Sequence, residues 1–348
     1  MTAVMPSSGA DTPGQPRLTE QGKPVTFLEA LREGIWEEME RDPDVFLMGE
    51  DIGAYGGAFK VTEGMQAHFG PSRVVETPIA ETGFTGAAAG ACHMGMRPVI
   101  EMQFIDFIAC AYDMITNYVA NSRYRGSGPQ PMVIRGPCGG YVRGGPFHSQ
   151  NPEAAFFHTP GLKLVYPSTA RDAKGLIKAS IRDDDPVIFF EHKWLYRRPQ
   201  LREVLSLDDD VVPLGKARTH REGRDLTIVT WGAMVHKSEE AAQVLEKEDG
   251  LSVEILDLRT LLPLDEEAIV RSVKRTNRLL VVHEDTRTGG LAGEIAMRVN
   301  EKAWEWLDAP VLRVTAADAP IPYSPPLEDY LLPQPEDVVK AARYLAAY

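Results

Sequence analysis

Apolar residues recur along this chain in two alternating patterns. Between Phe27 and Met39 they return every three or four positions, with Leu28, Leu31 and Ile35 on one face, which predicts an amphipathic helix. Short apolar runs follow, each long enough for one buried strand, and helical patterns separate most of them. Strand and helix therefore alternate, and this order predicts an α/β fold with a doubly wound, mostly parallel sheet. The runs cover residues 45–49, 97–102, 132–135, 162–166 and 187–190.

Three further helices are predicted in this half. One begins at Glu81 and continues through the glycine- and alanine-rich run 83–91, one spans Phe107 to Tyr124, and one begins near Thr169. In the run 83–91, small residues recur at three- and four-residue spacing and leave one face of the helix almost bare. Such a face lets another backbone approach closely, which predicts a helix–helix interface there.

The pattern is interrupted and then restarts in the second half. Residues 201–220 are polar and irregular, which predicts a linker between a first domain at 25–200 and a second, smaller α/β domain at 221–348. Strands of the second domain are expected at 226–230, 253–256, 279–282 and 311–314. The proline-rich segment 319–326 is expected to be irregular and to lie on the surface, and residues 1–24 are expected to form a flexible tail.

Composition narrows the class of protein. At 348 residues with a formal charge of −13, the chain suits about two domains and is a poor match for a non-specific nucleic-acid binder. Its apolar runs are too short to span a membrane. Three cysteines without a CxxC pair favour a reduced compartment, and the cytoplasm is the predicted location.

Common catalytic motifs are absent from the sequence. There is no GxGxxG or Walker A loop, no HExxH, no GxSxG and no Cys/His cluster with metal-ligand spacing. A nicotinamide-dependent dehydrogenase, a P-loop enzyme and a zinc hydrolase therefore lack their usual sequence support.

Three segments carry candidate chemistry. Glu81 stands where an extended, proline-containing segment gives way to the small-residue helix; it is either a catalytic acid or a simple complement to the helix dipole. His148 follows a long glycine-rich loop after a predicted strand and suits either acid–base work or a structural role. Gln103 and Phe107 are four residues apart, so one helical turn could present an amide and an aromatic face to a flat ring; the alternative for Phe107 is a place in the core.

Several of these segments resemble one family. The chain is similar, from about residue 24 to its C-terminus, to the beta subunits of thiamine-diphosphate-dependent 2-oxoacid dehydrogenases, the decarboxylating component of the pyruvate and branched-chain complexes. This resemblance implies a transketolase-like pyrimidine-binding domain followed by a transketolase C-terminal domain. The matching segments are 76–84, 101–107, 122–128, 148–150 and 173–176.

The resemblance also implies roles for single residues. Glu81 matches the carboxylate that bonds the aminopyrimidine ring nitrogen, which favours the imino tautomer able to remove a proton within the cofactor. Phe107 matches the residue that packs on the pyrimidine, and Gln103 and Ile79 match residues that line its pocket. His148 matches a histidine that assists acyl transfer to the lipoyl group.

Other ligands are implied to lie partly outside this chain. Thiamine enzymes hold the diphosphate through Mg²⁺ with a Gly-Asp-Gly segment, which does not occur in this sequence. A separate alpha subunit is therefore expected to supply the Mg²⁺ and diphosphate contacts within an α2β2 heterotetramer. The resemblance further implies a K⁺ site, although Asp185 stands where the family often has asparagine. The matching residues are Met132, Ser180, Ile181, Asp183 and Asp185.

The expected function is oxidative decarboxylation of a 2-oxoacid and acylation of the lipoyl group of a dihydrolipoyl acyltransferase. Segments 101–104, 189–197 and 283–285 favour a branched-chain, 2-oxoisovalerate-type substrate. Pyruvate and acetoin dehydrogenase beta subunits are alternatives. Two other classes stay open, a self-sufficient thiamine enzyme and a non-catalytic subunit that docks the acyltransferase.

Overall fold

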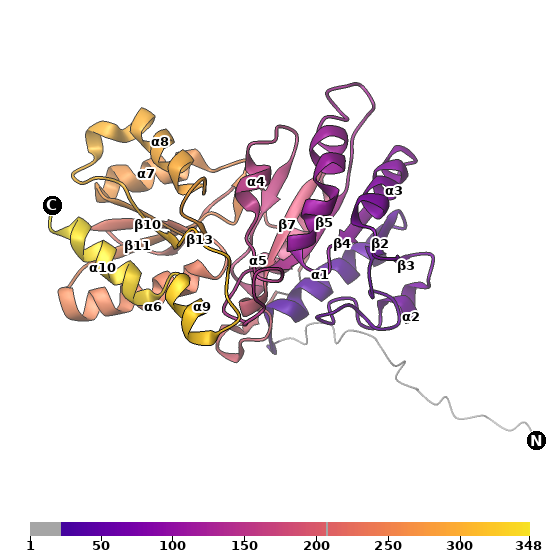
Figure 1. Cartoon of the computed structure of the whole chain (residues 1–348), viewed down its shortest axis with the longest axis horizontal. Coiled ribbons are helices and arrows are strands. Elements are labelled where there is room, and N and C mark those ends of the chain that lie inside the picture. Colours follow the sequence, from indigo (N-terminus) through magenta and orange to yellow (C-terminus); the bar gives the residue numbers. More distant parts are fainter. Residues whose placement is uncertain (1–21, 207) are drawn as a thin grey trace, which may run out of the picture.

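The apolar runs of the first half form strands that are buried on both faces of one sheet. The computed structural model that contains these strands describes residues 22–206 and 208–348 (Figure 1). The sheet has the order β12-β6-β7-β5-β4-β2-β3, and its members from β2 to β7 are parallel. This confirms the predicted doubly wound architecture. The bounds are β2 Val45–Gly49, β3 Val74–Glu76, β4 Arg97–Glu101, β5 Val133–Cys138, β6 Lys163–Val165, β7 Val187–His192 and β12 Thr260–Leu262.

Alternation along each strand divides the core between the two faces. In β7, Val187 and Phe189 pack on one side, while Ile188 and Phe190 pack on the other. The helices α1 (Phe27–Arg41) and α5 (Ala170–Arg182) cover the first face, and α3 (Glu81–His93) covers the second. Helices on both faces explain why these strands are apolar throughout rather than alternating with polar residues.

The pair α1 and α5 is held at close range. A side-chain carbon on Gly34 would stand 2.6 Å from Cγ2 of Ile177 and 3.1 Å from the Lys174 carbonyl, so only glycine fits there. Along the same contact, Lys174 Nζ pairs with Glu33 Oε1 at 2.7 Å and Lys178 Nζ pairs with Glu37 Oε2 at 2.5 Å.

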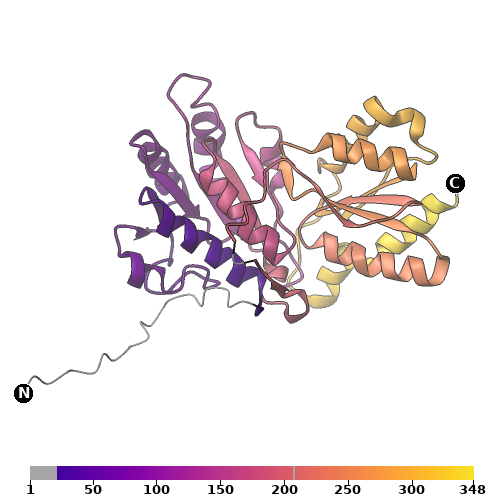
Figure 2. The same cartoon turned by 180° about the vertical axis from the view of Figure 1, so that it is seen from behind.

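The second half forms its own sheet, in the order β14-β13-β10-β11-β9. Only β9 in this sheet is antiparallel to its neighbour. Helices α6 and α10 lie on one face and α7 and α8 on the other (Figures 1 and 2). The bounds are β9 Arg218–Arg221, β10 Leu226–Thr230, β11 Val253–Asp257, β13 Leu279–Thr286, β14 Leu312–Ala316, α6 Met234–Asp249, α7 Glu266–Thr276, α8 Ala292–Ala303 and α10 Pro335–Ala346.

Two short pairings tie distant segments together. Strand β12, from the second half of the chain, extends the first sheet by pairing antiparallel with β6. Strand β1 (Pro24–Val25) pairs antiparallel with β8 (Glu203–Val204), which lies in the segment predicted to be a linker. The rest of the predicted tail, up to residue 21, lies outside the described residues. Among the helices that the structure describes, none is both long enough and apolar enough to cross a membrane.

Two predictions of local structure were wrong. The helix expected over 107–124 is a 3-10 helix, η1 (Ile105–Ala111), followed by a π-helical turn, η2 (Met114–Val119). Polar side chains there bond to nearby carbonyls, as when Asn121 Nδ2 donates to the Thr116 carbonyl at 2.9 Å, and so compete with the α-helical ladder. The proline-rich segment also contains the start of a helix, α9 (Pro325–Leu331), because proline fits the first turn of a helix.

Candidate active site

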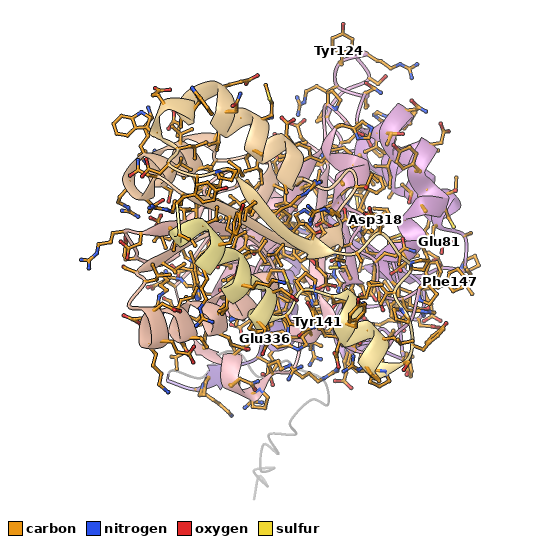
Figure 3. All side chains as sticks on the ribbon, turned by 60° about the vertical axis from the view of Figure 1, so that its left-hand side comes forward. Glu81, Tyr124, Tyr141, Phe147, Asp318 and Glu336 are labelled. Atoms are coloured by element: carbon orange, nitrogen blue, oxygen red, sulfur yellow. The ribbon has the colours of Figure 1, made fainter. Side chains whose placement is uncertain are left out.

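The candidate residues of the first half gather at one edge of its sheet. Strands β2, β3, β4 and β5 are parallel, so their carboxyl ends meet at the same edge, where α/β folds bind ligands. Glu50 and Asp51 follow β2, Glu81 lies beyond β3, and Gln103 follows β4. The loop after β5 brings His148 to this edge. Figure 3 labels Glu81 and Phe147, the neighbour of His148, on the same side of the molecule.

Glu81 is the first residue of α3 and is 9% exposed. Its carboxylate makes no hydrogen bond or ion pair to any residue that the structure describes. It lies near Glu50, a buried carboxyl whose pKa is raised by burial and by the charges of Glu81, Asp51 and Glu101. Oxygen Oε1 of Glu50 also has no hydrogen-bond partner among the described residues. Two acceptor groups at this edge are therefore open to a ligand.

The outer face of α3 is bare, as the run of small residues predicts. A side-chain carbon built on Gly90 would meet no other atom within 4 Å. Just before the helix, Ile79 is 83% exposed. The structure thus leaves an exposed surface beside Glu81, and the helix–helix interface predicted there stays a prediction.

Gln103 and Phe107 do not share a helical turn as predicted. Helix η1 begins only at Ile105, and the Gln103 amide instead donates to Oδ2 of Asp51 at 2.8 Å. Phe107 is half-buried and stands edge-on to the ring of His148, with centroids 5.8 Å apart. The two residues therefore reach the same edge from different local structures.

The ring of His148 is held between aromatic residues and a fixed backbone. It packs edge-to-face on Phe104 with centroids 4.4 Å apart. The next two backbone N–H groups, of Ser149 and Gln150, both donate to Oδ1 of Asp106 at 3.1 Å. Asp106 was not a candidate from the sequence, although a carboxylate within the apolar segment 104–108 is an unusual feature that could have indicated it.

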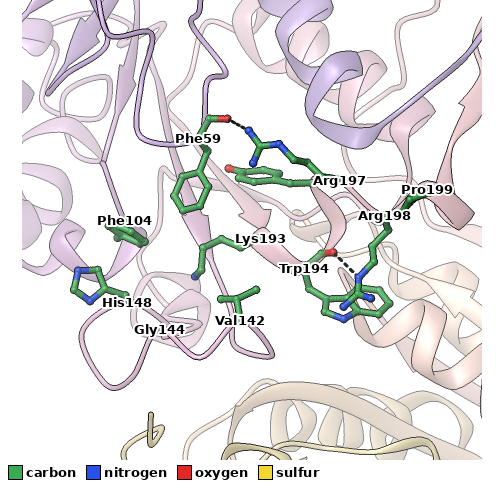
Figure 4. A pocket seen from close by; sticks show the side chains of 11 residues that line it. Phe59, Phe104, Val142, Gly144, His148, Lys193, Trp194, Arg197, Arg198 and Pro199 are labelled. Carbon is green, nitrogen blue, oxygen red and sulfur yellow. Dashed lines mark hydrogen bonds between the residues drawn. The ribbon is translucent and has the colours of Figure 1, made fainter. Parts of the chain in front are cut away.

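A cavity of about 640 Å³ opens beside His148 (Figure 4). Lys193 lies in its wall and is 6% exposed; its ammonium has no hydrogen-bond partner among the described residues, and burial lowers its pKa. The other lining residues are Phe59, Phe104, Val142, Gly144, Trp194, Tyr196, Arg197, Arg198 and Pro199.

A buried ion cluster lies behind this edge of the sheet. The guanidinium of Arg135, on β5, bonds to Glu101 on β4 and to Glu191 on β7, with its Nε 2.5 Å from Glu191 Oε1. Tyr196 donates to Oε2 of the same Glu191 at 2.6 Å. A signal for this cluster is present in the sequence, because Arg135 is the one charged residue in the buried strand β5.

The oxygen atoms of the predicted K⁺ site already have protein partners. The carbonyl of Ile181 accepts from Nη1 of Arg97 at 3.1 Å. Lys163 Nζ lies 2.6 Å from Oδ2 of Asp183, and Arg123 Nε lies 2.6 Å from Oδ1 of Asp185.

The remaining two members of this set are also used. The Met132 carbonyl accepts from the N–H of Val187 at 3.0 Å, and the Ser180 carbonyl accepts from the N–H of Asp183 at 3.3 Å. Arginine and lysine side chains thus contact part of this oxygen set, but each carbonyl oxygen keeps a second lone pair, so the K⁺ site stays a prediction.

Comparison with known proteins gives the family. The chain matches the transketolase pyrimidine binding domain over residues 23–199 and the transketolase C-terminal domain over residues 215–338. It is 46% identical over 327 residues to the 2-oxoisovalerate dehydrogenase subunit beta of Bacillus subtilis (strain 168), which covers 93% of this chain and 99% of that protein. The chain belongs to the beta subunits of the 2-oxoacid dehydrogenases.

Other members of this family are nearly as similar. The pyruvate dehydrogenase E1 component subunit beta of the same bacterium is 43% identical over 321 residues, covering 92% of this chain and 98% of that protein. A solved structure described as a split gene transketolase, inactive beta4 tetramer, matches with a TM-score of 0.74 and 23% identity. That match covers 93% of this chain and 99% of the other, and it bears on the fold alone.

This beta-subunit family depends on thiamine diphosphate, and the site fits one end of that cofactor. The open carboxylate of Glu81 suits a ring nitrogen, and the unpartnered Oε1 of Glu50 lies close to it. Phe107 offers an aromatic face at the same edge. The described residues contain no group of three or more His, Cys, Asp or Glu side chains placed to hold a metal ion. The side chains of Glu81, Glu50 and Phe107 suit the pyrimidine end of the cofactor.

Proposed function

We propose that this beta subunit forms half of an active site for the oxidative decarboxylation of a 2-oxoacid. The proposed substrate is of the branched-chain, 2-oxoisovalerate type. The observation that carries the proposal is the buried Glu81 carboxylate at the start of α3, open to a ligand and close to Glu50. Thiamine diphosphate, when bound, supplies the nucleophilic carbon and accepts the electron pair released as CO₂ leaves. Glu81 would hold the aminopyrimidine ring through its ring nitrogen, with Phe107, Gln103 and Ile79 around it.

We assign His148 to the transfer of the acyl group to lipoyl. It lies beside the 640 Å³ cavity, and its backbone is fixed by Asp106 at the two following residues. A histidine held in this way can exchange a proton with a sulfur or oxygen atom of an incoming group. Its position next to Phe107 places it at the same sheet edge as the proposed pyrimidine contacts.

The second half of the active site belongs to an alpha subunit in this proposal. The absence of a Gly-Asp-Gly segment from the sequence supports Mg²⁺ and diphosphate contacts that come from another chain. An α2β2 assembly with a lipoyl-bearing acyltransferase as its partner follows. The bare face of α3, next to Glu81, is available for such a contact.

The branched-chain substrate is supported by the relative of greatest identity among those given above. The pyruvate dehydrogenase relative is only slightly less similar, so the experiment compares the two substrates directly. Each chain alone and the two together should be assayed for decarboxylation of 2-oxoisovalerate and of pyruvate with thiamine diphosphate and Mg²⁺. Activity only in the mixture, with 2-oxoisovalerate preferred, is expected. Faster turnover of pyruvate would overturn the substrate, and turnover by this chain alone would overturn the shared site.

Two variants test the residues. Glu81→Gln should abolish decarboxylation while the two chains still assemble, and Glu301→Gln, an exposed carboxylate on α8, is the matched control. Full turnover by Glu81→Gln would remove this residue from the mechanism. His148→Ala should reduce lipoyl acylation more than cofactor binding, and an equal loss of both would contradict the role assigned to it.

A further inference from the structure

The C-terminal domain reaches into the active-site loop through one buried carboxylate. Glu284 lies on β13 and is 4% exposed, and both of its oxygen atoms point across the domain boundary. Oε1 accepts from the Gly140 N–H at 2.6 Å and from Nδ2 of Asn151 at 2.8 Å. Oε2 lies 2.7 Å from Nε2 of His192, at the end of β7. All three partners belong to the N-terminal domain.

The hydrogen bonds define the charge and direction of this contact. Nδ1 of His192 accepts from the Trp194 N–H at 3.2 Å, so Nε2 carries the proton and donates to Glu284. Burial by itself would raise the pKa of Glu284, but His192 and the donors Gly140 and Asn151 outweigh it and lower that pKa. The carboxylate is therefore ionised near neutral pH and accepts three charge-assisted hydrogen bonds.

Glu284 holds the two ends of the His148 loop, Gly140 through its backbone N–H and Asn151 through its side-chain amide. Gly140 is the second residue after β5, and Asn151 is the third residue after His148. Between them, Tyr141 and Arg143 have φ angles of 61° and 64°, a left-handed conformation that non-glycine residues seldom adopt. A loop with such residues keeps its shape only when its surroundings hold it.

A second buried carboxylate holds the middle of the loop from the same side. Glu328, on α9, is fully buried and accepts from the Arg143 N–H at 3.3 Å and from the Arg143 guanidinium. The Tyr141 hydroxyl donates to the Pro333 carbonyl at 2.6 Å. The C-terminal domain thus contacts the loop at several points, and Glu284 is its contact with both ends of the loop. Those ends are also joined directly, because the Gly139 N–H donates to the Gln150 carbonyl at 3.0 Å.

We propose that Glu284 is a positioning residue that ties the ends of the 140–151 loop together and so fixes the place of His148. The C-terminal domain then controls the geometry of an active site that is built otherwise on the N-terminal sheet. The contact with the loop stands on the hydrogen bonds alone. Its effect on acyl transfer rests on the proposed function of His148.

Hydrogen exchange of the full chain tests the contact without any assay of activity. In Glu284→Ala, the amides of residues 139–151 should exchange about tenfold faster or more, since each lost hydrogen bond to a charged group raises local opening by about that factor. Strands β10 and β13 should keep their protection. The matched control is Glu254→Gln, because Glu254 is equally buried on β11 but bonds to Ser272 and Arg275 within its own domain.

Unchanged exchange of the loop in a folded Glu284→Ala chain would overturn the proposal. If that variant does not fold, Glu284→Gln carries the test, because its amide can still accept from the loop but presents N–H groups to Nε2–H of His192. Glu284→Gln should speed amide exchange of the loop less than Glu284→Ala does. Exchange as slow as in the native chain would again refute the contact.

The assembled complex with its alpha subunit separates this inference from the proposed function. Glu284→Ala should reduce lipoyl acylation more than decarboxylation followed with an artificial electron acceptor. A loosened loop with full acylation would support Glu284 as the anchor of the loop and refute the role of His148. A loosened loop with slow acylation would support both.

Discussion

Replacing Arg135 by methionine should destabilise this protein more than almost any other single change of a charged residue. Arg135 is 2% exposed, and its partners Glu101 and Glu191 are 5% and 0% exposed. The guanidinium bonds both oxygen atoms of Glu191, at 2.5 and 2.6 Å, and one oxygen atom of Glu101. Methionine fills a similar volume but leaves two buried carboxylates without their counter-ion.

The size of the effect follows from that geometry. Removing one partner of a buried ion pair costs about 3–5 kcal/mol, because the remaining charge is neither solvated nor paired. Here one residue serves two carboxylates, so the upper part of that range is expected. A domain of this kind is stable by only about 5–15 kcal/mol in total, so the variant should be close to unfolding under mild conditions.

Urea unfolding at neutral pH measures this effect. The unfolding free energy of Arg135→Met should fall by about 3–5 kcal/mol. Arg123→Met is the matched control, because Arg123 pairs with Asp185 but has a side chain that is 54% exposed, and its stability should change far less. Adding Glu101→Gln and Glu191→Gln to Arg135→Met should restore most of the loss.

A loss below about 1 kcal/mol for Arg135→Met would refute the reasoning. The pH dependence provides a second check. Burial raises the pKa of Glu101 in the folded chain, so protonation at low pH favours the folded state, and this contribution is lost as pH rises through that pKa. The penalty of Arg135→Met should therefore shrink as the pH is lowered towards 5.

Three further predictions concern other regions. Burial and the charge of Arg313 lower the pKa of His283 to about 4. Neutral His283 therefore contributes roughly 3 kcal/mol to the unfolding free energy above its unfolded pKa of about 6.5, and this contribution is lost as the pH falls towards 4. His283→Gln should make the unfolding free energy less dependent on pH over that range, and an unchanged slope would contradict this prediction. Because the Met132, Ser180 and Ile181 carbonyls each keep a lone pair for a cation, K⁺ should raise the thermal midpoint more than choline at equal ionic strength, and an equal rise would contradict the predicted site. Thr169→Ala should reduce the unfolding free energy by about 1 kcal/mol, since Thr169 caps α5 by accepting from the Asp172 N–H at 3.2 Å; no loss in urea unfolding would mean that solvent replaces the cap.

Local sequence determined which segments became strands and where several helices begin. The apolar runs of the first half could be placed because strands buried on both faces are apolar throughout, and α1 could be placed because its apolar residues follow the helical period. The helix over 107–124 was predicted wrongly because its apolar period is helical, while its polar side chains compete for the backbone carbonyls. Strand β12 gave no signal of its own, since a three-residue edge strand depends on the sheet it joins.

The same division holds for the candidate site. Glu81, Gln103, Phe107 and His148 could be proposed from the sequence because short motifs carry them. These residues meet at one sheet edge because β2 to β5 are parallel, and the alternation of strands and helices along the chain already indicated a parallel sheet.

The partners that hold these residues were decided by tertiary structure alone. Glu284 is separated from Gly140 by 144 positions, and Asp106 from Ser149 by 43 positions, so no local pattern links them. Such contacts are strong because they are buried, and burial depends on the whole fold. A carboxylate in an apolar strand meets its hydrogen-bond donors only when distant segments of the chain pack against it.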